Sequence, residues 1–157
     1  MDILKSRLTP ENYKRLIKID NASLHEFVGK YIQLCNPDKV FVVDSGLANI
    51  AGFSFGENIG HYLENLVFNH YLAHNKKVYY WRNKGEVDFV VKEGLKVREL
   101  INVCYSLKDK EVLDREIESL KEAGGHFKNA TKKIVFWEAG GETPVSKEIK
   151  MIPVLEL

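Results

Sequence analysis

The sequence KVYYWRNKGEVDFVVK, residues 77–92, carries the clearest structural signal in the chain. Polar and apolar residues alternate with a period of two on both sides of Asn83-Lys84-Gly85, a run of turn-forming residues. This pattern predicts a β-hairpin whose strands are Lys77–Arg82 and Glu86–Lys92. After a second turn the alternation resumes, and it predicts a third strand at Val97–Ser106.

Segments on both sides of the hairpin predict helices and further strands. Capping residues and apolar spacing predict helices that begin near Thr9, Ser23, Asn58 and Asp109, the last of them closed by Gly124-Gly125. The further predicted strands are Val40–Val43, Ile134–Trp137 and an edge strand within Ile149–Leu157. We therefore expect an α/β (α+β) domain at residues 37–157, with a mixed β-sheet flanked by helices, and an N-terminal helical extension at residues 1–36.

The composition is typical of one folded domain. Of the 157 residues, 45% are hydrophobic and 29% are charged, and a formal net charge of +1 argues against a wholly basic nucleic-acid wrapper. No stretch approaches the ~20 apolar residues that a membrane span needs. No GxxxxGK[ST] motif is present, so the chain has no phosphate-binding P-loop. Cys35 and Cys104 have neither metal-site nor disulfide spacing, which favours a reducing cytoplasm as the location.

The helix predicted after Asn58 carries several polar candidates. Its apolar stripe consists of Ile59, Leu63, Leu66, Val67 and Tyr71. Glu64 is expected on the shoulder of this stripe, where a carboxylate at the solvent edge is the ordinary interpretation, and His61 either hydrogen-bonds it or caps the helix. His70 and His74 have the i, i+4 spacing of a helical zinc pair, but no third ligand has a recognisable spacing, and two polar histidines near a helix C-terminus are the favoured interpretation.

The two central strands carry polar residues among apolar ones. Alternation predicts that Glu86, Asp88 and Val90 share one face of their strand. An Asp in such a strand is costly unless a cation pairs with it. Asn102 and Cys104 are expected on one face of the next strand. For Cys104, a buried structural thiol is the simpler interpretation, since no His or cation beside it is indicated.

These residues, taken in order, resemble the PD-(D/E)XK (restriction-endonuclease-like) nuclease superfamily: a helix with an inward Glu, a GxxVD hairpin strand and a following strand. More closely, the chain resembles the C-terminal domain of uncharacterised function found on many prokaryotic AAA-type ATPases. The motifs that carry this resemblance are Val40–Leu47, Glu64-Asn65, Tyr80–Arg82, Gly85–Phe89 and Leu100–Ser106. The resemblance runs from about Lys39 to Leu120 and more weakly to Trp137, and it implies a restriction-endonuclease-like fold.

The resemblance also implies roles for individual residues. Glu64 matches the helix carboxylate, and Asp88 matches the strand aspartate that coordinates a divalent cation in active nucleases. These two oxygen donors would suit Mg²⁺ or Mn²⁺. Asn102 falls where a second strand carboxylate is expected, and Cys104 falls where the catalytic lysine is expected. Both depart from the nuclease pattern, and Lys84 in the hairpin turn is the candidate for a displaced lysine.

The missing lysine decides between three functional hypotheses. A thiol carries no positive charge to stabilise a nucleophile or a developing phosphorane, so a degenerate, non-catalytic module that binds nucleic acid or a protein partner such as an ATPase is favoured. The alternative is an active Mg/Mn-dependent DNA or RNA phosphodiesterase that uses Glu64 and Asp88 with Lys84. A third hypothesis is an assembly element in which a salt bridge to Arg82 or Lys84 holds the two acids.

Charge around the hairpin favours nucleic acid as a partner. Residues 74–98 hold seven basic residues against three acids, whereas residues 109–123 carry a net charge of −3. The residues predicted to contact DNA or RNA phosphates are Lys76, Lys77, Arg82 and Lys84. The run Tyr79-Tyr80-Trp81 predicts either base stacking or two core side chains with one exposed ring.

Overall fold

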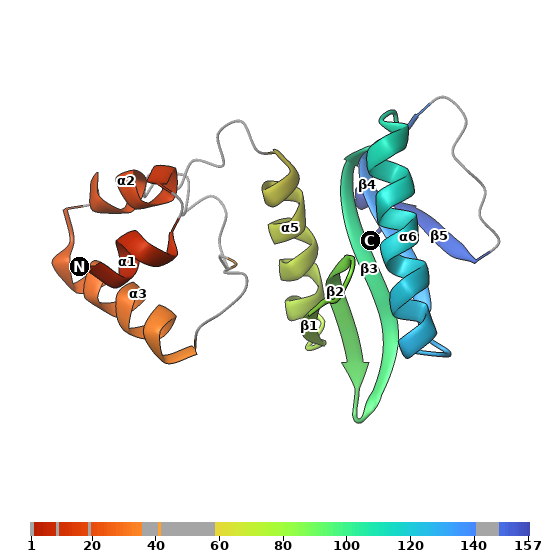
Figure 1. Ribbon diagram of the computed structural model, residues 1–157, viewed down its shortest axis with the longest axis horizontal. Coiled ribbons are helices and arrows are strands. Elements are labelled where there is room, and N and C mark those ends of the chain that lie inside the picture. Colours follow the sequence, from red (N-terminus) through yellow and green to blue (C-terminus); the bar gives the residue numbers. More distant parts are fainter. Residues whose placement is uncertain (1, 9, 19, 36–40, 42–58, 141–147) are drawn as a thin grey trace. The chain divides into compact units, whose positions relative to one another are not determined.

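The computed structural model describes residues 2–8, 10–18, 20–35, 41, 59–140 and 148–157 (Figure 1). The chain forms two compact units, Met1–Glu57 and Asn58–Leu157. The predicted domain boundary between residues 36 and 37 lies outside the described residues. So does the strand predicted at Val40–Val43, apart from Phe41.

The first unit contains three described helices, α1 (Asp2–Arg7), α2 (Pro10–Lys18) and α3 (Ala22–Cys35). The helices predicted near Thr9 and Ser23 are thus present as α2 and α3, whereas α1 was not predicted. Asn21 caps α3, because its side-chain oxygen accepts a hydrogen bond from the Leu24 amide at 2.9 Å. The core of this unit is small and consists of Leu4, Leu16 and Ile32.

The described residues of the second unit form a five-stranded mixed sheet in the order β1-β2-β3-β4-β5. The strands are β1 (Lys77–Arg82), β2 (Glu86–Glu93), β3 (Lys96–Ser106), β4 (Thr131–Glu138) and β5 (Ile149–Pro153). The pairs β1–β2 and β2–β3 are antiparallel, while β3–β4 and β4–β5 are parallel. The predicted fold class is confirmed, and the last strand lies at a sheet edge, as its proline requires. A short 3₁₀ helix, Val154–Glu156, follows it.

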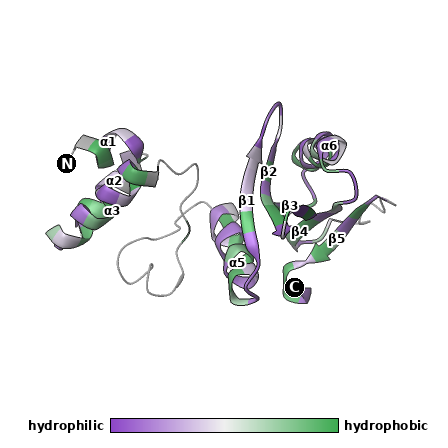
Figure 2. Cartoon of the chain, turned by 90° about the horizontal axis from the view of Figure 1, so that it is seen from below, coloured by the Kyte–Doolittle hydropathy of each residue, from purple (hydrophilic) through white to green (hydrophobic). Residues whose placement is uncertain are grey.

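Two helices cover opposite faces of this sheet: α5 (Ile59–Ala73) and α6 (Lys110–His126). Glu99 of β3 contacts α5, whereas Asn102 of the same strand contacts α6. Because side chains alternate across a strand, residues three apart point to opposite faces. Figure 2 shows the two helices on either side of the sheet. No helix in the described part of the chain is long and apolar enough to cross a membrane.

The apolar face of α5 is narrower than predicted. Leu63, Val67 and Tyr71 are buried, but Ile59 and Leu66 are exposed. The three buried apolar residues recur every four positions and form a single row along the helix, whereas the two flanking residues of the predicted stripe are exposed.

The start of α6 agrees with the sequence, but its end does not. The Asp109 side chain accepts hydrogen bonds from the amides of Glu111 and Val112, as expected of a helix cap. The helix then continues through the glycines that were predicted to close it and ends at His126. Gly124 lies within the helix against the flexible end of the Lys132 side chain of β4, and it does not stop the helix.

A buried polar triad fastens α5 to the sheet. The Tyr71 hydroxyl donates to Glu99 Oε2 at 2.8 Å, and Lys133 Nζ donates to the same oxygen at 2.6 Å. Burial, followed by the hydrogen bond to Glu99, raises the pKa of Tyr71 well above its usual value, so the phenol stays protonated and remains a donor.

Replacing Tyr71 with Phe should lower the free energy of unfolding by about 1–2 kcal/mol, because a hydrogen bond to a charged carboxylate is lost while the ring is kept. Urea denaturation followed by fluorescence measures this. The matched control is Tyr79→Phe, since Tyr79 is half exposed and its change should stay within about 0.5 kcal/mol. Equal losses in the two variants would contradict the role given to Tyr71.

Candidate functional site

The candidate site is built on a β-bulge in β2. Tyr79 pairs with Val90 and Trp81 pairs with Val87, so Asp88 and Phe89 together oppose Tyr80 alone. The predicted alternation through Glu86, Asp88 and Val90 is therefore wrong. Val87 and Val90 instead pack in one core cluster under α6. Phe89 faces the other helix, with its ring 6.5 Å from that of Phe68 in α5.

Side chains replace the backbone ladder where β2 and β3 diverge. The last backbone pair is Phe89 with Ile101. Beyond it, the Asp88 amide donates to Asn102 Oδ1 at 3.2 Å, and the Val103 amide donates to Asp88 Oδ2 at 2.9 Å. These side-chain groups accept hydrogen bonds from two backbone amides at this point of the sheet. Asp88 and Asn102, both predicted as site residues, are thus brought together directly.

Asn102 connects three elements through its amide. Its side chain is fully buried, and Nδ2 donates to Glu116 Oε2 in α6 at 2.6 Å. Longer contacts reach the carbonyl oxygens of Glu86 (3.3 Å) and Glu116 (3.4 Å). Because Oδ1 accepts from a backbone amide, the orientation of the side chain is fixed by its partners. We call Asp88, Asn102 and Glu116 the polar latch.

Glu116 is a site residue that the sequence reasoning missed. Its side chain is only 13% exposed, and Oε1 accepts a hydrogen bond from Arg115 at 3.0 Å. It lies between Leu113 and Leu120, both buried, on the apolar face of α6. Glu64 is a candidate because its carboxylate lies beside the apolar stripe of its helix. Glu116 occupies the same kind of position in α6, so the helical spacing of apolar residues in the sequence also indicates Glu116.

Cys104 lies two residues after Asn102 and faces the same core cluster. Burial raises the pKa of its thiol, and Sγ donates to the Ser106 carbonyl oxygen at 3.0 Å. The thiol is therefore protonated at neutral pH and supplies no charge at the position where the nuclease pattern has a lysine.

The remaining predicted site residues lie on other elements. Glu64 is in α5, mostly buried, with Oε1 3.4 Å from His61 Nδ1. Lys84 is exposed in the hairpin turn. That turn is held to α6 because Glu122 accepts from Asn83 at 3.0 Å and from the Gly85 amide at 2.9 Å.

Neither Arg82 nor Lys84 forms an ion pair within the described part of the chain, so the salt bridge expected from the assembly hypothesis is not found there. Among the residues that the structure describes, no group of three or more His, Cys, Asp or Glu is placed to hold a metal ion. The rings of His70 and His74 are 4.4 Å apart, and His74 Nδ1 is within 2.8 Å of the His70 carbonyl oxygen. Burial, followed by the neighbouring His74, lowers the pKa of His70.

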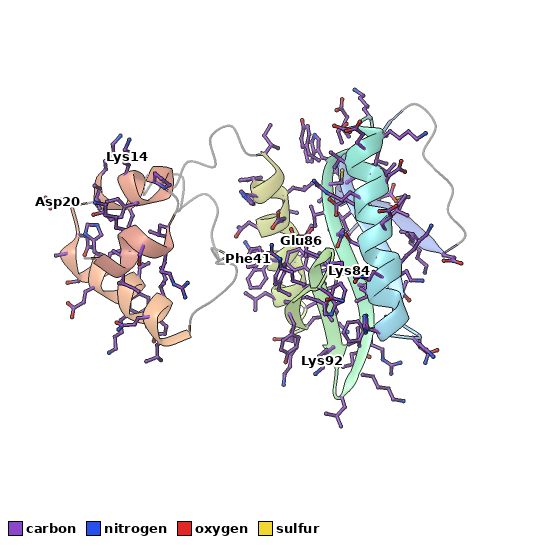
Figure 3. All side chains as sticks on the ribbon, in the orientation of Figure 1. Lys14, Asp20, Phe41, Lys84, Glu86 and Lys92 are labelled. Atoms are coloured by element: carbon purple, nitrogen blue, oxygen red, sulfur yellow. The ribbon has the colours of Figure 1, made fainter. Side chains whose placement is uncertain are left out.

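A groove of about 720 Å³ lies between the hairpin and the segment after α6. We call it the aromatic groove, after Tyr79, Tyr80, Trp81 and Phe127, which line it. Its basic lining residues are Lys92, Lys96, Arg98 and Lys128, and no acidic residue lines it. In Figure 3, Lys92 lies well away from Lys84 along the hairpin.

The aromatic side chains of the groove differ in their surroundings. Trp81 is partly buried, with its ring 5.7 Å from His126 and 6.3 Å from Phe127. The Tyr80 hydroxyl donates to Glu86 at 2.6 Å. Tyr79 is 50% exposed, and Lys92 Nζ lies 5.2 Å from the centre of its ring. The run thus combines a core side chain with an exposed ring, as one interpretation of the sequence expected.

Of the four lysines and arginines predicted to contact phosphates, none lines the aromatic groove. Lys76 instead pairs with Glu93 at 2.7 Å, and Glu93 also holds Arg98 at 3.2 Å. Phe127 and Lys128 could not be assigned to the groove from the sequence, because they follow α6 and meet the hairpin only in the folded chain.

Replacing Asn102 with Asp should destabilise the fold by about 2–4 kcal/mol at pH 7, because it removes a donor and sets a second carboxylate beside Glu116. Two facing carboxyl groups bind a proton more tightly in the folded than in the unfolded chain, so stability falls as pH rises through their titration. The loss should therefore shrink at pH 4–5. Urea denaturation at both pH values measures it.

The matched control is Asn83→Asp, because Asn83 also donates to a glutamate of α6, Glu122, but at an exposed position. Its effect should stay below about 0.5 kcal/mol at either pH. A similar loss in both variants, or one that does not change with pH, would contradict the polar latch.

Alkylation of Cys104 by iodoacetamide at pH 7.5 should be at least about tenfold slower in the folded chain than in urea, because the buried thiol is protonated. Peptide mass spectrometry measures this cysteine separately from Cys35. Equal rates in the two conditions would show that the thiol is accessible and ionised.

Comparison with known proteins places the second unit in a family. The family described as "Domain of unknown function (DUF4143)" matches residues 59–157, from α5 to the end of the chain. Uncharacterized protein MJ1544 of Methanocaldococcus jannaschii is 34% identical over 119 residues, which cover 71% of this chain and 26% of that protein. A phosphoenolpyruvate carboxykinase [GTP] of Thermococcus sibiricus is 51% identical over 41 residues, 26% of this chain and 7% of that enzyme.

The chain thus spans about a quarter or less of the length of these relatives. No solved structure matches it. The family match covers the whole described sheet, both helices that pack on it, the polar latch and the aromatic groove, and the chain therefore belongs to the DUF4143 family.

Proposed function

We propose that the second unit is a non-catalytic module that binds nucleic acid. The observation that carries this proposal is the polar latch: Asp88 and Asn102, two of the four residues aligned with a nuclease site, form hydrogen bonds that join β2, β3 and α6. Asp88 Oδ2 accepts from the Val103 amide, and Asn102 bridges β2, β3 and α6. A carboxylate engaged in this way is less available as a metal ligand than one directed into a cleft.

The chemistry of the third strand supports the same proposal. Phosphodiester cleavage needs a cation beside the metal to stabilise the developing charge. At the corresponding position this chain has Cys104, whose thiol is buried and neutral. Lys84, the candidate replacement, is exposed in a turn that Glu122 fastens to α6. We also propose that the second unit is related to the PD-(D/E)XK nucleases, because its motifs follow the same order along the sequence.

Basic side chains around the hairpin and the aromatic groove support nucleic acid as the ligand. Lys77, Arg82 and Lys84 form no ion pair among the described residues, and Lys96 and Lys128 of the aromatic groove form none either. Such unpaired cations contact phosphates without reading sequence.

An AAA-type ATPase is the proposed protein partner, because the motifs resemble those of a domain found on such ATPases. A reducing cytoplasm is the proposed location, which suits the free thiol of Cys104.

Cleavage is tested by incubating the full chain with single- and double-stranded DNA and RNA in Mg²⁺ or Mn²⁺. We expect no cleavage above that of Glu64→Gln and Asp88→Asn variants; the second keeps an oxygen for the Val103 amide. Cleavage by the wild type that both variants abolish would replace this proposal with the metal-dependent nuclease. Lys84→Ala would then test the displaced lysine.

Binding is tested by titrating labelled DNA or RNA at several salt concentrations. Affinity should fall steeply as salt rises, and Lys96→Ala with Lys128→Ala should reduce the logarithmic salt slope by roughly 1–2, about one for each lost phosphate contact. The matched control is Lys150→Ala, an exposed lysine on β5 at the opposite edge of the sheet. Binding that is absent, or independent of salt, would refute the proposal.

A further inference from the structure

We propose that the aromatic groove is a site for single-stranded nucleic acid, in which an unpaired base stacks on Tyr79. This inference rests on the proposed function and narrows its ligand. It assigns the contact to residues of β1, β2 and β3 together with the segment after α6, rather than to the residues aligned with the nuclease site.

Tyr79 is suited to stack on a base. It is 50% exposed although it lies between the better-covered side chains of Val78 and Tyr80, and no hydrogen bond holds its hydroxyl among the described residues. Lys92 Nζ lies 5.2 Å from the ring centre and so occupies one face. A base would stack on the other face of the Tyr79 ring. The Lys92 ammonium on the opposite face would strengthen the stacking of this ring on an electron-rich base.

One side of the groove packs against neighbouring rings. Trp81 is partly buried, with its ring 5.7 Å from that of His126 and 6.3 Å from that of Phe127, which also lines the groove. Side chains that are held in place before binding lose little conformational entropy on binding. The exposed ring therefore stands beside a preformed surface.

The charges of the groove are complementary to a phosphate backbone. Lys92, Lys96, Arg98 and Lys128 line it, and the nearby Glu93 already pairs with Lys76 and Arg98. Lys96 is the first residue of β3, and Lys128 lies in the turn after α6. A strand that crosses the groove would therefore meet cations from two separate segments of the chain.

Single-stranded nucleic acid fits these observations better than a duplex or an acidic peptide. In a duplex the faces of the bases are stacked on one another, so the Tyr79 ring would have nothing to stack on. An acidic peptide would neutralise the lysines but offers no flat ring for Tyr79. A groove of about 720 Å³ also falls within the range of ligand clefts, roughly 300–1,000 Å³.

The test measures fluorescence anisotropy of the full chain with three labelled 12-mers: single-stranded oligothymidine, an abasic strand with the same number of phosphates, and a duplex, which has the higher charge density. We expect the single strand to bind more tightly than the other two. Tyr79→Ala should weaken its binding by roughly 5- to 150-fold, the effect of one lost base stack, and leave duplex binding within about twofold. Tyr79→Phe should bind like the wild type.

The matched control is Tyr105→Ala, which removes a partly exposed tyrosine of β3 that does not line the groove, and it should bind like the wild type. The inference is overturned if Tyr79→Ala binds the single strand normally, if the abasic strand binds equally well, or if polyglutamate competes as effectively as oligothymidine. The proposed function survives the first two outcomes provided that binding falls with salt. If none of the nucleic acids binds, the proposed function itself fails.

Discussion

The buried amide of Asn102 is the interaction on which the arrangement of the second unit depends. At the point where β2 and β3 stop pairing through their backbones, this side chain accepts from Asp88 and donates to Glu116. It thereby provides a hydrogen-bond partner for a backbone amide of β2 and for a carboxylate of α6, and the Asn102 side chain itself is fully buried. A buried donor or acceptor without a partner costs about 1–3 kcal/mol, so each member of the polar latch requires the others.

This dependence explains how a site can keep the outline of a nuclease motif and take on another role. A carboxylate at position 102 would repel Glu116, and a lysine at position 104 would place an ammonium in an apolar cluster. Asn102 and Cys104 avoid both costs. The two departures from the nuclease pattern are thus consistent with each other and with the glutamate on α6, since Asn102 donates to Glu116 and the Cys104 thiol adds no charge to the core cluster.

The strands and the start of α6 could be predicted because their determinants are local: runs of β-forming residues bounded by turn residues in β2 and β3, and a capping side chain at Asp109. The bulge could not be predicted, because it depends on which neighbours β2 pairs with on each side. The glycines in α6 were misinterpreted for a similar reason, as only the fold brings Lys132 against Gly124. The resemblance identified Asp88 and Asn102 together, but only the geometry supplied Glu116.

The bulge has a consequence for how this family can vary. The irregular register lies between Tyr79 and Trp81, two of the aromatic residues that line the groove, and Asp88 and Phe89 together oppose Tyr80 there. The same extra residue in β2 positions Asp88 beside Asn102. Deleting one residue here would restore a straight ladder and alter the aromatic groove and the polar latch in a single step. The two features are therefore expected to be gained or lost together among relatives, although no residue belongs to both.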